Sequence, residues 1–197
     1  MLVVPVEDDI ISMHVESASN TISESDYGAH TLLLYENLET LREFYSHYVK
    51  KRVEERNEVI QLVPFYETED SVRQSLSEGQ ISIDIEKWEK EEKSLIIVDS
   101  LKKFFGSVPL ESEYDSNKKL VDYAKTMGKK GVSILGDAGA FPHKHRIDDL
   151  MNHELSLPSK FDMNLKRICL FHKNDFNRLS EEQKQKLVHH HPLVIRI

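Results

Sequence analysis

HTLLLYENLETLREFYSHYVK, residues 30–50, holds the two periodicities on which the fold of this chain depends. The three leucines at 32–34 are continuous rather than alternating, which predicts a strand buried on both faces of a parallel sheet. Asn37 then reads as a helix N-cap, and apolar residues recur at helical spacing as far as Val49. A buried strand that runs directly into an amphipathic helix is the repeating unit of an α/β fold.

The same alternation continues through the rest of the chain. Core strands are predicted in EVIQLVPFY, SLIIVDS, GVSILGDAGAF, LKRICLFHK and PLVIRI. Helices are predicted between them, among others over residues 69–79, 117–128 and 146–155, with glycines closing two of them. ISIDIEKW, which begins at residue 81, alternates apolar and polar residues and predicts an exposed edge strand. The pattern therefore predicts an α/β layer fold with a mainly parallel sheet.

Composition limits the location and the partners of this protein. A net charge of −8 opposes a broad nucleic-acid footprint, which needs a basic surface. Cys169 is the single cysteine, so no disulfide can form within the chain, which suits a reducing cytosol. No apolar run approaches the roughly 20 residues of a membrane span, and residues 1–11 lack the basic region of a signal peptide. We therefore expect a cytoplasmic protein without membrane contact or direct nucleic-acid binding.

Residues 1–28 differ in composition from the remainder of the chain. They are acidic, rich in Ser and Asn, and without a sustained period, which predicts a flexible N-terminal arm. VVPV at 3–6 is interpreted as a short strand that docks on the body. A single folded domain is predicted over residues 29–197.

The turn after the first core strand carries no phosphate-binding loop. A Walker A loop reads GxxxxGK[ST] there, because glycines let backbone amides face the phosphates and lysine supplies charge. YENLETLREF, residues 35–44, has neither glycine nor lysine, and Glu36, Glu39 and Glu43 would repel a triphosphate. Asp99, which ends the strand SLIIVDS, therefore lacks a phosphate partner. We favour a helix cap over a metal-binding carboxylate at this position.

Polar and aromatic residues fall at the predicted carboxyl ends of the strands, where parallel sheets bind ligands. These ligand-binding candidates are Tyr35, Glu36, Asp99, Ser100, Gly136, Asp137, Phe171 and His172. Each residue alone is also explained by a helix cap or a solvated loop. The GDAG sequence at 136–139 fits a plain turn as well as an anion-binding nest. The convergence of the whole set on one edge is what favours a pocket.

Metal binding and catalysis have weaker sequence signals. His143, His145 and His153 offer imidazoles that zinc accepts, but their spacing matches no metal-binding motif, so a solvated basic loop is preferred. No metal and no cofactor are expected. The chain contains no GxSxG, HExxH or recognisable Cys–His signature, and we predict that it is not an enzyme.

Three further residues that carry reactive groups are interpreted as structural. Cys169 lies between apolar residues of a core strand, which predicts a buried, inert thiol. His30 lies at the end of its strand opposite to the candidate ligand site. His191 is expected to cap the C-terminus of a helix, where a protonated imidazole favours the helix dipole.

Four stretches carry a resemblance to a known family. They are HTLLLYEN at 30–37, GVSILGDAGAF at 131–141, HELSL at 153–157 and KRICLFHKNDFNRLSEEQKQKLVHHHPLVI at 166–195. Together they resemble the MEDS domain, a sensory family named for methanogens, methylotrophs and the dichloromethane-responsive regulator. The resemblance covers about residues 28–197. It implies a three-layer RecA-like (KaiC-like) fold with a mainly parallel sheet between helices, from which the Walker A loop has been lost.

The resemblance also implies a role in archaeal or bacterial signal transduction. The chain is expected to be a non-enzymatic sensory module that binds a small molecule, such as a simple hydrocarbon derivative. Because the chain has no room for an output domain, the signal is expected to pass to a partner protein, a kinase or a transcription regulator. A homo-oligomer is expected by analogy with RecA-like domains alone.

Two alternatives to the sensory function stay open. One is a degenerate RecA-like nucleotide-binding protein or weak ATPase, in which Asp99 is retained for a metal ion. The other is a protein-interaction scaffold without a ligand, which predicts a small or filled cleft at the strand ends.

Overall fold

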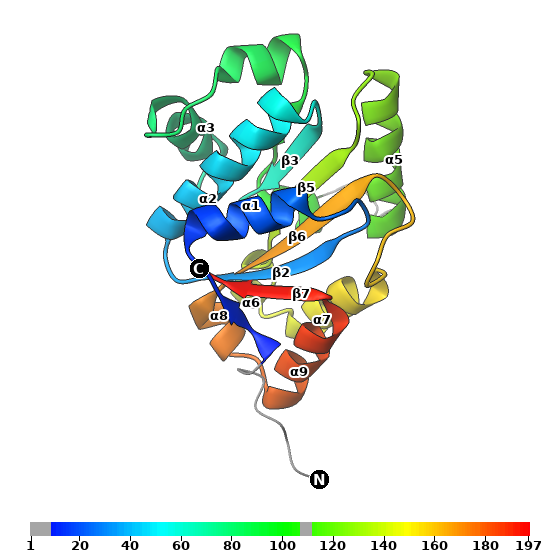
Figure 1. The fold of residues 1–197 in the computed structure, drawn as a ribbon. Coiled ribbons are helices and arrows are strands. Elements are labelled where there is room, and N and C mark those ends of the chain that lie inside the picture. Colours follow the sequence, from blue (N-terminus) through cyan, green and yellow to red (C-terminus); the bar gives the residue numbers. More distant parts are fainter. Residues whose placement is uncertain (1–8, 107–111) are drawn as a thin grey trace.

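Seven parallel strands form one sheet at the centre of the molecule (Figure 1). The computed structural model describes residues 9–106 and 112–197. The strand order is β1-β7-β2-β6-β5-β3-β4, and every neighbouring pair is parallel. The strands are β1 (Ile11–Ser12), β2 (His30–Tyr35), β3 (Val59–Val63), β4 (Leu95–Ile97), β5 (Val132–Asp137), β6 (Leu165–His172) and β7 (Leu193–Arg196). The predicted α/β fold with a parallel sheet is confirmed.

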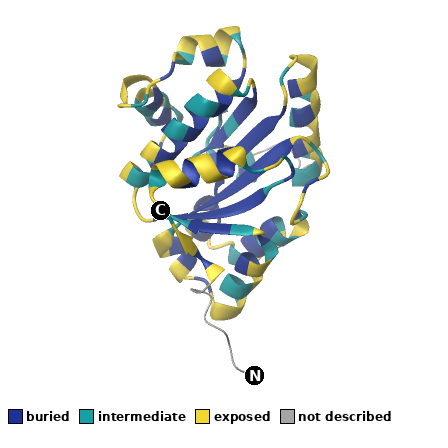
Figure 2. Ribbon diagram, viewed as in Figure 1, coloured by how far each residue is buried: buried dark blue, intermediate teal, exposed yellow. Residues whose placement is uncertain are grey.

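Helices cover both faces of this sheet, so that it is the middle of three layers (Figure 2). One face carries α1 (Val15–Glu24), α2 (Leu38–Lys50), α3 (Glu69–Glu78) and the π-helical turns η2 (Lys51–Glu55) and η3 (Lys87–Glu91). The other face carries α4 (Ser100–Phe105), α5 (Glu113–Thr126), α6 (Ala140–His143), α7 (Ile147–Ser156), α8 (Lys173–Asn177) and α9 (Glu181–His190). None of the helices within residues 9–106 and 112–197 has the length and apolar content needed to cross a bilayer.

The alternation of side chains along each strand decides which layer a residue reaches. Leu33 and Tyr35 of β2 pack into the core beneath α1 and α2, whereas Leu32 and Leu34 pack into the core of the opposite layer. The neighbouring strand β6 alternates in the same way, with Leu170 on the α2 side. Polar groups on adjacent strands can therefore meet only where this two-residue period places them on the same face.

The N-terminal segment is where the structure departs most from the sequence-based expectation. Residues 1–8, which include the predicted strand at 3–6, lie outside the described residues. In place of the expected flexible arm, β1 pairs with β7, and α1 packs on α2 in front of the sheet (Figure 1). Ala18 and Ile22 of α1 are fully buried. Their four-residue spacing gives the helix one apolar face, which the intervening polar residues Ser19, Asn20 and Thr21 concealed in the sequence.

The segment predicted as an edge strand, residues 81–88, is not a strand. It turns into η3, with Ile83 and Trp88 both buried. The side chain of Asp84 accepts a hydrogen bond from the backbone N–H of Lys87 at 3.0 Å. An aspartate that satisfies a free N–H at a helix start favours the turn over extended backbone. The edge of the sheet beside β3 is instead formed by β4.

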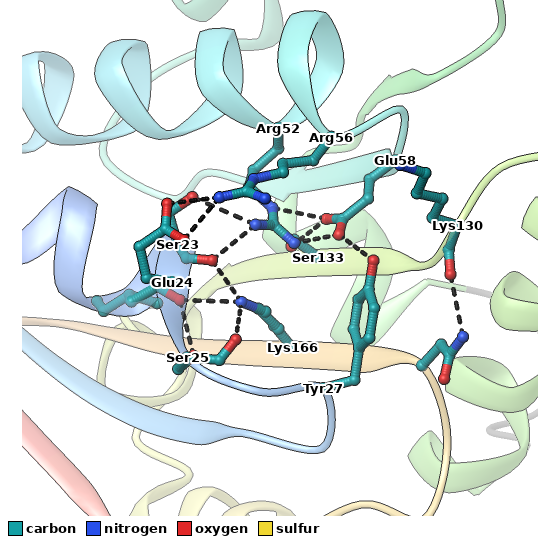
Figure 3. Close-up of polar contacts among 12 residues, drawn as sticks. Ser23, Glu24, Ser25, Tyr27, Arg52, Arg56, Glu58, Lys130, Ser133 and Lys166 are labelled. Carbon is teal, nitrogen blue, oxygen red and sulfur yellow. Dashed lines mark hydrogen bonds and ion pairs between the residues drawn. The ribbon is translucent and has the colours of Figure 1, made fainter.

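A buried polar network fastens α1 to the amino-terminal end of the sheet (Figure 3). Arg52 donates from Nε to Oε2 of Glu58 at 2.7 Å and forms a second bond from Nη2 to Oε1. The Tyr27 hydroxyl also donates to Glu58. Arg52 and Lys166 both donate to the backbone carbonyl of Ser23, at 2.7 and 2.6 Å. These bonds satisfy carbonyl groups that the end of α1 leaves without helical partners.

Candidate functional site

Tyr35, Asp137 and His172 meet at the carboxyl edge of the sheet, at the ends of the adjacent strands β2, β5 and β6. The Tyr35 hydroxyl donates to Oδ2 of Asp137 at 2.6 Å. The ring of His172 packs edge-on against Tyr35, with 5.3 Å between ring centroids. From β2 the chain crosses to β3 on one side of the sheet, and it later returns to place β7 on the other side of β2. The three residues therefore lie at a switch in strand order, where open α/β sheets bind their ligands.

A second tyrosine–carboxylate pair lies beside the first. The hydroxyl of Tyr66, in the loop between β3 and α3, donates to Oδ2 of Asp175 in α8. The Tyr66 ring lies 5.2 Å from the ring of His172, measured between centroids. Neither residue was among the sequence-based candidates. The signal that pointed to this loop is PFY at 64–66, two aromatic residues directly after a core strand.

An apolar cavity of about 20 Å³ lies between α2 and the carboxyl ends of β3, β5 and β6. Leu41, Leu62, Val72 and Leu170 form much of its wall, and Glu67 and Asp137 contribute buried carboxyl groups. A cavity of this volume has room for a water molecule or a ligand of one or two heavy atoms, since about 10–15 Å³ on this measure admits one water. Anything larger requires side chains to move.

Burial controls the ionisation of Asp137. Removal of the carboxyl group from water raises its pKa to about 7, against the opposing effect of the hydrogen bonds from Tyr35 and from the Gly139 backbone N–H. That N–H donates to Oδ1 of Asp137 at 2.8 Å. Burial also raises the pKa of the Tyr35 hydroxyl, which therefore remains a donor. The cavity wall thus contains a carboxyl group that changes charge near neutral pH.

Replacement of Asp137 by asparagine should remove a pH dependence of stability. A carboxyl group with a pKa of about 7 when folded and about 3.9 when unfolded gains a proton on folding, so its contribution to stability falls as the pH rises between these values. From about pH 5 to about pH 8, we expect wild-type protein to lose about 2 kcal/mol more than D137N. Urea unfolding of both proteins across this range measures the difference. Parallel pH profiles would contradict the assignment.

Three other predicted site residues lie on the same edge but away from the cavity. The exposed Glu36 pairs with Lys173 at 2.7 Å. Asp99 caps α4 by accepting from the Lys102 backbone N–H at 3.0 Å, which confirms the predicted helix cap. Ser100 is fully buried as the first residue of that helix.

Gly136 and Phe171 do not join the candidate site, because these positions face the opposite side of the sheet from Tyr35, Asp137 and His172. Phe171 is buried in the layer of α6–α9, where its ring packs against Phe176. Gly136 faces the same layer, and a side chain there would approach Arg167 rather than the cavity. The prediction placed both residues at the correct edge but on the wrong face.

A group of carboxylates lines an open groove at this edge. This groove of about 440 Å³ runs beside Phe65 and Tyr66 and is lined by Glu67, Glu69, Asp70 and Asp99. Clustered carboxylates disfavour a polyphosphate by charge repulsion. Here Arg42 pairs with Glu67, and Arg73 pairs with Glu69 and Asp70, so part of this negative charge is offset.

The histidines considered as metal ligands do not come together. His143 and His145 are exposed, and His153 lies apart from them with its Nε2 3.1 Å from Nη2 of Arg167. Within residues 9–106 and 112–197, the group of side chains with metal-ligand geometry is a different one: His30, Glu154, Cys169 and His191. The sequence-based interpretation treated three of these residues separately, and it did not consider Glu154. The signal available in the sequence was the two-residue period of the strands, which places His30 and Cys169 on the same face of the sheet.

The architecture has a known counterpart among solved structures. A KaiC-like protein from the hyperthermophilic archaeon Pyrococcus horikoshii superposes with a TM-score of 0.56 at 18% sequence identity, over 82% of this chain and 70% of that protein. The chain has a KaiC-like, RecA-like fold. No protein-family model matches the sequence, and no curated protein does. At this level of identity the similarity shows the fold alone.

The turn from β2 into α2 is the segment whose sequence lacks the glycines and lysine of a Walker A loop. Its residues are Glu36 and Asn37. The Asn37 side chain accepts from the Thr40 backbone N–H at 3.0 Å, so one of the amides at the start of α2 already has a partner. A phosphate would need those amides to be free. The local structure thus agrees with the absence of glycine and lysine from the sequence.

Proposed function

We propose that this protein is a non-enzymatic sensory domain that binds a very small ligand in the cavity beside Asp137 and signals to a partner protein. The observation that carries this proposal is an apolar cavity at the switch in strand order, with two buried carboxyl groups in its wall. One is that of Asp137, and the other is that of Glu67, which forms an ion pair with Arg42. The resemblance of residues 28–197 to the MEDS family supports a simple hydrocarbon derivative as the ligand class.

The walls of the cavity define the chemistry of that ligand. Leucine, valine and proline side chains favour an apolar body. Asp137, with a pKa of about 7, donates a hydrogen bond when protonated and accepts one when ionised. Its two oxygens already accept from Tyr35 and from the Gly139 N–H, so one hydroxyl or amine on a small organic molecule would add a further hydrogen bond to it. A ligand of more than one or two heavy atoms would have to displace part of the wall.

The loop at 64–68 is the element that such a displacement would move. Phe65 and Tyr66 form part of the cavity wall, and Tyr66 is 41% exposed. Tyr66 also bonds to Asp175 in α8, so the loop connects the cavity to the opposite layer. A ligand that binds one position of this loop better than another shifts its population, which a partner protein can detect at the surface.

One observation favours the alternative of a scaffold without a ligand. The cavity volume of about 20 Å³ is far below the roughly 300 Å³ of an ordinary ligand pocket. The ligand screen described next is designed to separate the two functions.

Filling the cavity should abolish ligand binding without unfolding the protein. Val72 lines the cavity, and Val72→Ile adds one methylene group to it. In a thermal-shift screen of small alcohols, amines, halocarbons and short acids, we expect a ligand at 100 times its dissociation constant to stabilise the wild-type protein by about 2.7 kcal/mol. The same ligand should leave the melting temperature of V72I unchanged, because its space is occupied.

Val121→Ile is the matched control. Val121 is also a buried helical valine, but it lies in α5 in the opposite layer and should retain the ligand response. Equal responses in V72I and V121I would place binding elsewhere on the molecule. Stabilisation by ATP with magnesium alone would support the nucleotide-binding alternative, and no stabilisation by any compound would support the scaffold.

A further inference from the structure

Four buried side chains that ligate metals converge between the sheet and the helices α7 and α9. His30 begins β2, Cys169 lies on the adjacent strand β6, Glu154 lies in α7, and His191 follows α9. One ligand atom from each residue lies within 4.8 Å of every other, and all four residues are buried. They come from widely separated parts of the chain, so their convergence is a product of the tertiary fold.

Backbone hydrogen bonds fix the orientation of both imidazoles. Nδ1 of His30 lies 2.9 Å from the carbonyl oxygen of Pro158, and Nδ1 of His191 lies 2.7 Å from that of Leu187. A carbonyl oxygen only accepts, so each Nδ1 carries the proton and each Nε2 presents a lone pair. The lone pair of His30 accepts from the Cys169 thiol, whereas that of His191 has no donor. Both Nε2 atoms face Glu154. In metalloproteins, histidine ligands are held in this way by a partner of the second ring nitrogen.

Two atoms facing the centre of this group lack hydrogen bonds. Among residues 9–106 and 112–197, neither Oε2 of Glu154 nor Nε2 of His191 has a hydrogen-bond partner, although their side chains are 4% and 0% exposed. Buried polar atoms in native proteins are nearly always bonded, and an unpaired one calls for an explanation such as an ion. A cation between Glu154 and His191 would satisfy both atoms.

The distances suit a tetrahedral metal ion. Nε2 of His30 lies 3.3 Å from Sγ of Cys169 and 4.0 Å from Oε2 of Glu154. Nε2 of His191 lies 3.6 Å from the same Oε2. Bonds of about 2.0–2.3 Å to a tetrahedral zinc ion place its ligand atoms roughly 3.3–3.7 Å apart. Small side-chain movements would therefore close the group around zinc.

The local charge balance also favours a divalent ion. Carboxylate and thiolate ligands from Glu154 and Cys169 together offset two positive charges. The nearby Arg167 is separately neutralised by Glu113, with 2.7 Å from Nη1 to Oε1. A cysteine binds zinc as the thiolate, so the Cys169 thiol would release its proton as the metal binds.

We propose that His30, Glu154, Cys169 and His191 form a closed structural site for one zinc ion. The mixture of imidazole, thiolate and carboxylate ligands suits zinc and disfavours magnesium or calcium, which take oxygen ligands. Four protein ligands in a buried position leave no open coordination place for a substrate. The ion joins β2 and β6 to α7 and to the end of α9, and so holds the C-terminal helix on the sheet.

The test uses the full chain, purified without an affinity tag, dialysed against zinc, and then freed of excess metal. Elemental analysis should find one zinc per chain, and chelation should lower the melting temperature. When zinc is exchanged for cobalt, the protein should show the visible absorption bands of a tetrahedral cobalt ion. It should also show a near-ultraviolet charge-transfer band from thiolate to cobalt, which reports Cys169 directly. Cys169→Ser should remove the thiolate band and weaken zinc binding by more than the 10–100-fold typical of losing an outer-shell partner.

His189→Gln is the matched control, because its imidazole is 70% exposed and is not one of the four proposed ligands. It should retain stoichiometric zinc and the thiolate band. Zinc bound by surface histidines would instead give no thiolate band and would persist in C169S. Absence of zinc from the wild-type protein, or cobalt spectra without a thiolate band, overturns the proposal even if C169S does not fold.

Discussion

Glu58→Gln should lower the free energy of unfolding by about 3–5 kcal/mol, because it leaves a buried guanidinium without its counter-ion. Glu58 is 0% and Arg52 is 3% exposed. The carboxylate accepts two hydrogen bonds from Arg52, and further bonds from Tyr27 and Ser133 (Figure 3). Glutamine has nearly the same shape but no charge, and its amide nitrogen can only donate, so one of the two acceptor atoms is lost. Urea unfolding at neutral pH measures the loss.

Glu55→Gln serves as the control for that substitution. Glu55 ends the same π-helical turn that carries Arg52, and it is exposed. Its replacement should change stability by no more than about 0.5 kcal/mol. Replacing Arg52 and Glu58 together with methionine and leucine should be less damaging than E58Q alone, because no unpaired charge remains. An E58Q loss as small as that of E55Q would mean that the Arg52 charge finds water or another partner.

Ile22→Ala should destabilise the protein by about 2–5 kcal/mol, the range for truncation of a buried isoleucine or leucine. Ile22 is fully buried where α1 packs on α2. Alanine would leave a cavity beneath α1, and the loosened helix would weaken the bonds from Arg52 and Lys166 to the Ser23 carbonyl. The substitution therefore tests whether residues 15–24 belong to the folded domain. Denaturant unfolding followed by circular dichroism gives the change in free energy.

Ile11→Ala is the same chemical change at a position that is 48% exposed. It should cost less than about 1 kcal/mol, the span of strand propensities. A flexible arm over residues 1–28 makes the opposite prediction, since neither substitution would then affect stability. Equal and negligible effects of I22A and I11A would restore that interpretation.

The fold was predictable because its main signals are local. In β2 and α2, a continuous apolar run and an N-capped helical period specify a buried strand followed by a helix, whatever the rest of the chain does. The absence of glycine and lysine from the turn at 35–44 likewise excluded a Walker A loop without reference to the structure. Asp99 was correctly predicted as a helix cap, because a cap depends on residues three positions apart.

Errors arose where local pattern and tertiary packing disagreed. In α1, three apolar residues among serines are a weak period, and burial against α2 supplies what the sequence lacks. At 81–88, three isoleucines in alternation suggest a strand, but the Asp84 cap and the burial of Trp88 stabilise a helical turn. At Phe171 the predicted edge of the sheet was correct and the predicted face was wrong, because successive side chains along a strand point to opposite faces.

The sequence by itself determined the α/β class, the succession of most strands and helices, and the edge at which polar residues gather. It could do so because periodicity, capping and turn chemistry act over a few neighbouring residues. Only the tertiary structure decided that Tyr35, Asp137 and His172 meet. It alone also gathered His30, Glu154, Cys169 and His191 into one buried group. Such meetings depend on strand order and register, which arise from packing between segments far apart in the chain.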